Sequence, residues 1–187
     1  MAEHDRVTPM DGLISAARRA EREGRGAPPV HLWDPPYCGE IDIVIRRDGT
    51  WVHEGTPIGR PGLVRLFASI LKREGERFFL VTPVEKVGLR VEDAPFVAVD
   101  FERIEGALRF ETNVGDRVTA GPDHLIRVET AEDGTPSPYV EIRRGLEARI
   151  DRKSFYRLVE EGEVRGAAFG VTSGGAFFEI GPAEALG

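Results

Sequence analysis

Alternating apolar and polar residues mark much of the chain as short β-strands. Ile41, Ile43 and Ile45 alternate with polar neighbours, which is the period of a strand with one buried face. The Asp-Gly dipeptide at 48–49 favours a tight hairpin turn into the next strand at 51–52. Alternation or short apolar runs predict further strands at 78–82, 87–91, 96–101, 108–112, 125–129, 140–143, 169–172 and 177–180.

Three other stretches carry apolar residues at the spacing of an amphipathic helix. The predicted helices run from Thr8 to Gly24, from Pro61 to Gly75 and from Asp151 to Glu161. The first begins with the capping-box form Thr-Pro-Met-Asp, and Asp151 caps the third. Gly and Pro interrupt residues 24–36, which predicts an extended connection anchored by Trp33 and Tyr37.

One pattern of features occurs twice in the chain. Each copy has an apolar strand ending in Arg-Arg, a helical stretch, a Gly-Glu pair and a strand ending in Val-Thr. The first copy occupies 43–49, 75–76 and 79–82, and the second occupies 140–145, 162–163 and 169–172. Four matched features in one order predict an internal duplication.

These elements predict an α+β protein with mainly antiparallel sheets and three helices. Residues 1–94 would hold the N-terminal helix and a first ββαββ unit, and residues 95–187 would form a second, related unit. Two such units predict a ligand-binding cleft where they meet.

Composition narrows the classes of partner. The 187 residues include 25 Lys and Arg against 32 Asp and Glu, a net charge of -7, which argues against a nucleic-acid binder that works by neutralising phosphates. No apolar run approaches the roughly 20 residues that cross a bilayer, and the first residues are too polar for a secretory signal. A single cysteine, Cys38, agrees with a reducing compartment. We therefore expect a cytoplasmic protein without a membrane or nucleic-acid partner.

The sequence lacks the usual signatures of metal, cofactor and nucleophile sites. Its histidines stand far apart, without the spacing that places two ligands on one metal. No glycine-rich phosphate loop occurs, so neither a metal nor a cofactor is expected. Ser173 lies in Val-Thr-Ser-Gly-Gly, which lacks the glycine that a nucleophile turn has two residues before the serine, and a hairpin turn explains it better.

Two predicted turns of the first unit carry charged residues that could face a ligand. Glu85 and Lys86 follow Thr82-Pro83, and Asp93 precedes Ala94-Pro95. The alternative is that they are solvated turn residues.

The second unit offers polar residues at turns and arginines on strands. Asn113 and Asp116 flank Gly115; such residues commonly bond their own backbone in a turn, but they can also bind the ring edge or hydroxyls of a ligand. His124 and Arg127 bracket a strand start, and Arg143 belongs to the repeated Arg-Arg pair. An inward arginine needs a carboxylate or an anionic ligand as its partner, and a structural ion pair stays an alternative.

Several blocks in order resemble a proteobacterial family catalogued as domain of unknown function 1285. They are GEIDI at 39–43, DGTW at 48–51, GTPI at 55–58, LVTPVEK at 80–86, VEDAPF at 91–96, TNVGD at 112–116 and PYV at 138–140. The resemblance implies a duplicated two-domain fold with a pleckstrin-homology-like second domain. It also implies a nucleotide-like ligand between the domains and a part in signal transduction, without an established activity.

The leading hypothesis is a non-catalytic protein that binds a nucleotide-like or other anionic small molecule. Arg127 and Arg143 would meet the anion, Asn113 and Asp116 would bind a ring edge or hydroxyl, and Tyr139 would offer an aromatic surface. A protein–protein interaction module that binds along a sheet edge is the first alternative. The second is a hydrolase that uses Glu85, Asp93 or His124 for proton transfer, which ranks last because no pair of these residues has diagnostic spacing.

Overall fold

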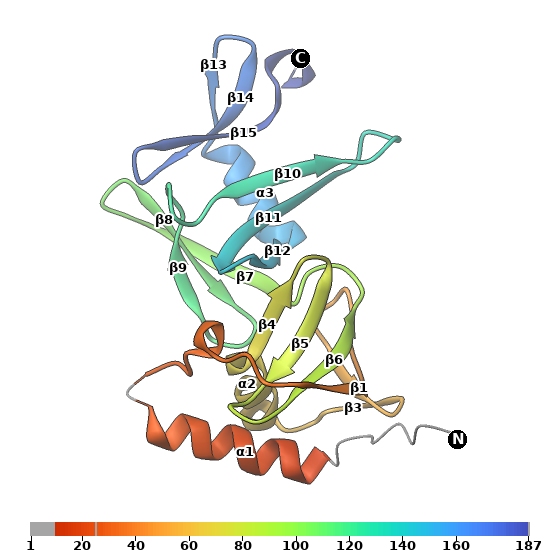
Figure 1. Ribbon diagram of the computed structural model, residues 1–187. Helices are drawn as coiled ribbons and strands as arrows, with labels where there is room; N and C mark the ends of the chain where they lie inside the picture. Colours follow the sequence, from red (N-terminus) through yellow and green to blue (C-terminus); the bar gives the residue numbers. More distant parts are fainter. Residues whose placement is uncertain (1–9, 25, 187) are drawn as a thin grey trace. The chain divides into compact units, whose positions relative to one another are not determined.

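The computed structural model describes residues 10–24 and 26–186, and the chain divides after Asp93 into two compact units (Figure 1). Three α-helices and mainly antiparallel strands make up the described residues, which confirms the predicted α+β class. The predicted start of the first helix, at Thr8-Pro9, lies outside the described residues. No helix among the described residues has the length and apolar character needed to span a membrane.

The first unit contains one six-stranded sheet. Its elements are α1 (Met10–Glu23), the short 3-10 helix η1 (Val30–Leu32), β1 (Tyr37–Ile45), β2 (Trp51–His53), β3 (Thr56–Pro57), α2 (Pro61–Ser69), β4 (Leu71–Glu74), β5 (Arg77–Val81) and β6 (Lys86–Val91). The strand order is β3-β2-β1-β6-β5-β4, in which β1 and β6 run parallel and every other pair is antiparallel. Three strands therefore precede α2 in the sequence and three follow it, whereas the ββαββ pattern predicts two before and two after.

The hairpin predicted at Asp48-Gly49 is confirmed. Ile45 pairs with Trp51 across the turn, and the Thr50 amide donates to Asp48 Oδ1 at 2.9 Å. Gly49 takes a φ of 90°, a value that side-chain-bearing residues rarely adopt. The turn thereby sets which face of β2 points into the core.

The core of the first unit lies between its sheet and its helices. Ile43 and Ile45 are fully buried on β1, as the alternation predicts. Trp51 and Phe67 are buried as well, and their rings stack with centroids 6.3 Å apart. Helix α1 buries Leu13, Ala17 and Ala20 and packs beside α2, as Figure 1 shows.

The second predicted helix is shorter than expected. Helix α2 ends at Ser69, and after Ile70 the residues Leu71–Glu74 form strand β4. Leu71 pairs with Leu80 and Glu74 with Arg77, and Gly75 makes the β4–β5 turn with a φ of 59°. Pairing with β5 therefore prevails over the helical spacing of Phe67, Ile70 and Leu71.

The second unit contains two sheets. Its elements are β7 (Phe96–Ile104), β8 (Ala107–Thr112), β9 (Arg117–Thr119), β10 (Ile126–Thr130), β11 (Pro136–Arg143), β12 (Leu146–Ile150), α3 (Arg152–Glu160), β13 (Glu163–Arg165), β14 (Ala168–Ser173), β15 (Ala176–Pro182) and the 3-10 helix η2 (Ala183–Leu186). One sheet has the order β10-β11-β12-β7-β8-β9, with β7 and β12 parallel, and the other has the order β13-β14-β15.

The two six-stranded sheets share one topology, in agreement with the predicted duplication. Each consists of two three-stranded meanders, and the first and last of its six strands pair in parallel: β1 with β6, and β7 with β12. The sequence repeat nevertheless aligned the wrong strands. It matched the strand at 43–49 with the strand at 140–145, which is β11, whereas the shared topology makes β7 the counterpart of β1. Arg46-Arg47 and Arg143-Arg144 therefore do not stand on equivalent strands.

The pleckstrin-homology-like character of the second unit and the cleft expected from the repeat stay predictions.

Ser173 has a structural role in the second unit. It is fully buried at the end of β14; its Oγ donates to the Ala120 carbonyl at 2.7 Å and accepts from the Leu108 amide at 2.7 Å. Gly174 follows and lies against Ala120, where an added Cβ would come within 2.9 Å of the carbonyl oxygen. Ser173 thus joins the smaller sheet to the larger one, as expected for a residue of a hairpin and not of a nucleophile turn.

Candidate functional site

The predicted residues of the second unit lie on β11 and the segments beside it. Arg127 on β10 pairs in register with Tyr139 on β11, and its guanidinium lies over the tyrosine ring, 4.4 Å from the centroid. Tyr139 is buried, with 3% of its surface exposed. Its ring therefore packs against Arg127, which occupies the place that a ligand's ring was expected to take.

Two glutamates hold Arg127. Its Nε donates to Glu147 Oε1 at 2.6 Å and its Nη2 to Glu147 Oε2 at 2.7 Å, while Nη1 contacts Glu129. These hydrogen bonds, chiefly those to Glu147, raise the pKa of Arg127 above its usual value. A bidentate arginine–carboxylate contact, with two parallel hydrogen bonds, is among the stronger ion pairs of proteins. The arrangement corresponds to the structural ion pair that the sequence left open as an alternative.

Asp116 and Arg143 form the second pair. Arg143 Nη1 donates to Asp116 Oδ2 at 2.7 Å, and the guanidinium lies 5.2 Å from the centroid of the Phe96 ring. The side chains of Asp116 and Arg143 are 37% and 30% exposed. Two predicted site residues thus meet at a partly exposed position, which makes this pair a candidate for contact with a ligand.

The turn at 113–116 is fixed by its own hydrogen bonds. The Asn113 amide donates to the Val97 carbonyl at 2.8 Å, and its side-chain Oδ1 accepts from the Val97 amide at 3.0 Å. The Asp116 amide donates to Thr112 Oγ1 at 3.1 Å. Asn113 thus joins the turn to β7 and sets the position of Asp116, which is the turn role that the sequence left open.

His124 lies two residues before β10, in an isolated bridge with Gly121. Its Nδ1 is 3.1 Å from the Glu141 carbonyl oxygen, and its backbone exchanges two hydrogen bonds with Gly121, both of 3.1 Å. The imidazole therefore contacts the main chain of β11. The hydrolase hypothesis needs a proton-transfer partner for His124, and this contact does not supply one.

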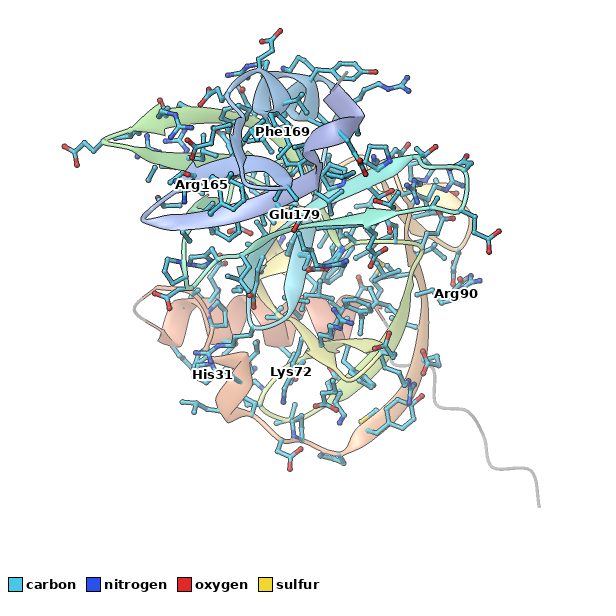
Figure 2. The ribbon with its side chains drawn as sticks, turned by 90° about the horizontal axis from the view of Figure 1, so that it is seen from above. His31, Lys72, Arg90, Arg165, Phe169 and Glu179 are labelled. Carbon is cyan, nitrogen blue, oxygen red and sulfur yellow. The ribbon has the colours of Figure 1, made fainter. Side chains whose placement is uncertain are left out.

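Lys86 belongs to a charged cluster on the first sheet. Its Nζ lies 3.0 Å from Glu74 Oε2 and 4.8 Å from the centroid of the Phe79 ring. Lys72, labelled in Figure 2, lies 3.2 Å from Glu74 Oε1 and also donates to the Trp33 carbonyl at 3.1 Å. The cluster therefore ties β6 and β4 together and anchors the 24–36 connection through Trp33.

Glu85 and Asp93 lie at separate turns of the first unit. Thr82 organises the first turn: its amide donates to the Glu85 carbonyl at 2.9 Å, and its Oγ1 accepts from the Glu85 amide at 3.2 Å. Asp93 Oδ2 lies 3.7 Å from Arg47 Nη1, and its side chain is 17% exposed. These contacts give both residues turn or ion-pair roles, and a role in binding stays a prediction.

The cluster around Glu74 predicts a pH-dependent stability. Hydrogen bonds and charge from Lys86, then Lys72, lower the pKa of Glu74 below its usual 4.5. A carboxylate with a lowered folded-state pKa stabilises the fold above its unfolded pKa, and this is lost as the pH falls through the folded value. Glu74→Gln should therefore lower the melting temperature at pH 7. The decrease should be only roughly 1–3 °C, because Glu74 and its two lysine partners are partly exposed.

Thermal unfolding of both proteins between pH 7 and pH 3 measures this effect. The difference between parent and variant should shrink as the pH drops below 4.5. Glu76→Gln is the control, because Glu76 is 96% exposed and should leave the curve unchanged. A difference that stayed constant over this range would contradict the role of the Glu74 charge.

Sequence reasoning missed the main partner of Arg127. Glu147 was not singled out, although Leu146, Ala148 and Ile150 alternate with polar residues and so predict a strand with Glu147 and Arg149 on its other face. The residues that the structure describes hold no group of three or more His, Cys, Asp or Glu that could bind a metal ion.

Family models match both units. The model described as the N-terminal domain of the domain of unknown function DUF1285 matches residues 28–94, and the corresponding C-terminal model matches residues 95–180. No curated protein matches the chain.

Two solved structures are similar to this chain. A DUF1285 family protein from Silicibacter pomeroyi DSS-3 is 55% identical with a TM-score of 0.85, over 94% of this chain and 97% of that chain. A DUF1285 family protein from Shewanella baltica OS155 is 34% identical with a TM-score of 0.52, over 63% of this chain and 90% of that chain. The two domain models together span most of the sequence, and the resemblance noted from the sequence blocks is confirmed: the chain belongs to the DUF1285 family.

Proposed function

We propose that the protein binds a nucleotide-like or other anionic small molecule without catalysing a reaction, and that Asp116 and Arg143 make the main contacts. The observation that carries the proposal is the partly exposed pair itself, with a guanidinium donor 2.7 Å from a carboxylate acceptor. A guanidinium binds phosphate or carboxylate oxygens in a bidentate contact. A carboxylate beside it can accept from a sugar hydroxyl or a ring N–H of the same ligand.

A ligand can replace Asp116 as the partner of Arg143 at a small cost in free energy. Ion pairs that remain partly exposed contribute only about 0–1 kcal/mol, because water screens them. An oxyanion can therefore compete with Asp116 for Arg143. Asn113 supports the site indirectly, since its hydrogen bonds to Val97 hold the turn that carries Asp116.

In this proposal Arg127 does not contact the anion, although the sequence suggested that it would. Its bonds to Glu147 and its packing on Tyr139 make it a structural residue of the β10–β11–β12 region. Arg143 would then meet the anion without Arg127. A ligand that prefers one conformation shifts the population toward it, which is how such binding would serve signal transduction in the cytoplasm.

Calorimetry against mono-, di- and cyclic nucleotides tests the proposal. One or more of these should bind saturably, and Arg143→Ala should weaken that binding about tenfold or more, because a charge-assisted contact is lost. Arg117→Ala is a matched control, since Arg117 is an exposed arginine of the same unit, 3.3 Å from Glu111. Arg127→Ala should lower the melting temperature and leave the affinity nearly unchanged.

Two results would contradict the proposal. One is the absence of any binding heat across the panel with the folded parent protein. The other is saturable binding that Arg143→Ala leaves intact. The protein-module and hydrolase alternatives remain predictions, and no contact of the described residues favours either over ligand binding.

A further inference from the structure

The outer face of the β1–β6–β5 region carries a second charged arrangement, separate from Asp116 and Arg143. Val44 pairs in register with Arg90, and Phe78 pairs with Leu89. Neighbouring residues of a strand point to opposite faces, so Arg77 and Arg90 share the face that holds Val44. Two arginines therefore lie on adjacent strands of one face, each beside a carboxylate.

Each of these arginines has an internal carboxylate as its partner. Arg77 is bonded to Glu40, which also accepts from the Tyr37 hydroxyl at 2.5 Å. Arg90 Nη2 lies 3.6 Å from Asp42 Oδ1, beyond hydrogen-bond distance. The four charged side chains are between 53% and 76% exposed, and Figure 2 shows Arg90 directed away from the strands.

Gly88 provides the space in which the Glu40 carboxylate lies. Glu40 and Gly88 pair in register, and an added Cβ at Gly88 would stand 2.3 Å from Glu40 Oε2 and 2.4 Å from Oε1. The carboxylate therefore rests directly on the sheet, in a notch that any larger residue would fill. Arg77 meets it there and also packs on the rings of Tyr37 and Phe79, at 5.3 and 4.9 Å.

A hollow shares Arg77 with this notch. It has a volume of about 420 Å³ and is lined by Val44, Glu76, Arg77, Phe78, Leu89, Arg90, Val91 and Glu92. This volume lies in the range of small-molecule sites, which bury an apolar body and fix its polar group by a few charged contacts.

We propose that this face binds a small organic oxyanion, a carboxylate or a phosphate monoester, whose charged group takes the place of the Glu40 carboxylate beside Arg77 and Arg90. In the absence of such a ligand Glu40 acts as an internal substitute for it. The apolar part of the ligand lies in the hollow against Val44. Exposed ion pairs of this kind contribute about 0–1 kcal/mol, so an external anion can displace Glu40 at little cost.

The exchange predicts opposite effects for the two members of one ion pair. Arg77→Ala removes the anion partner and should weaken binding about tenfold or more. Glu40→Gln removes the internal competitor and should strengthen binding about three- to fivefold. A surface patch that merely attracts anions would not require Glu40 to occupy the same place as the ligand.

A titration of the isotope-labelled full-length protein with phenyl phosphate, followed by NMR, tests the proposal. Phenyl phosphate should shift the amide signals of Gly88 and Arg90 saturably, phenol should not, and inorganic phosphate should bind the same residues more weakly. Glu76→Gln is the matched control for Glu40→Gln, because Glu76 lines the same hollow and is 96% exposed but pairs with Arg73 and not with Arg77.

The outcomes separate cleanly. Saturable shifts at Gly88 that strengthen with Glu40→Gln and weaken with Arg77→Ala support the site. Shifts confined to the second unit, equal effects of Glu40→Gln and Glu76→Gln, or no saturable shift would overturn it. Arg143→Ala should not change this titration, so the result is independent of the proposed function.

Discussion

Replacing Gly170 with alanine should strongly destabilise the β13–β14–β15 sheet. An added Cβ would lie 2.1 Å from the Phe178 carbonyl oxygen and 2.8 Å from the Phe178 carbonyl carbon. Those atoms belong to the backbone of β15, which is hydrogen-bonded to β14 and has no rotamer through which to withdraw. The clash must therefore be relieved by separating the strands, at a cost of roughly 3 kcal/mol or more.

Thermal and urea unfolding of the purified variant measure this loss. The melting temperature should fall by roughly 10 °C or more. Gly181→Ala is the matched control on the neighbouring strand β15, because its added Cβ would meet nothing within 4 Å. Equal melting temperatures for the two variants would show that β14 and β15 can separate at this point without cost.

Replacing Phe67 with alanine should remove roughly 3–5 kcal/mol from the stability of the first unit. Phe67 is fully buried on α2 and stacks on Trp51, whose surface is 2% exposed. Truncation removes the apolar area of one ring and also leaves a cavity beside the other. A cavity between a helix and a sheet closes poorly, because both elements are held by regular hydrogen bonds.

Urea unfolding of Phe67→Ala, compared with Phe67→Leu, separates the cavity from the loss of the aromatic ring. Leucine keeps most of the volume and should cost roughly 1–2 kcal/mol. Loss of near-ultraviolet circular dichroism from Trp51 should accompany the alanine variant. If alanine and leucine cost the same, the Trp51–Phe67 contact is not the packing centre that its burial indicates.

Local pattern was sufficient for many of the elements. The alternation of Ile41, Ile43 and Ile45 predicted a strand with one buried face, and Asp48-Gly49 predicted the turn after it. These features depend on neighbouring residues, and so a single sequence reveals them. Strand β4 was missed because its assignment depends on a partner: Leu71 continues the spacing of α2, but it pairs with Leu80 on β5.

The site was harder to predict for the same reason. An arginine on a strand can be recognised, but its carboxylate depends on the register of strands far apart in the sequence. Arg127 meets Glu147 because β10, β11 and β12 align in the observed register. The ion pair of Arg77 and Glu40 likewise joins β5 to β1, with Gly88 of β6 beside the carboxylate. No spacing rule relates such positions.

The parallel pairing of first and last strands has a consequence for synthesis on the ribosome. In the first unit β1 can bind β6 only after the whole meander series has been translated, because Tyr37 pairs with Lys86 and Ile45 with Val91. Contacts of such long sequence separation slow folding. The nascent chain therefore carries an incomplete sheet with an open edge on β1 until residue 91 has left the exit tunnel. Since the unit boundary follows at Asp93, the growing polypeptide can close its first sheet before the second has been made.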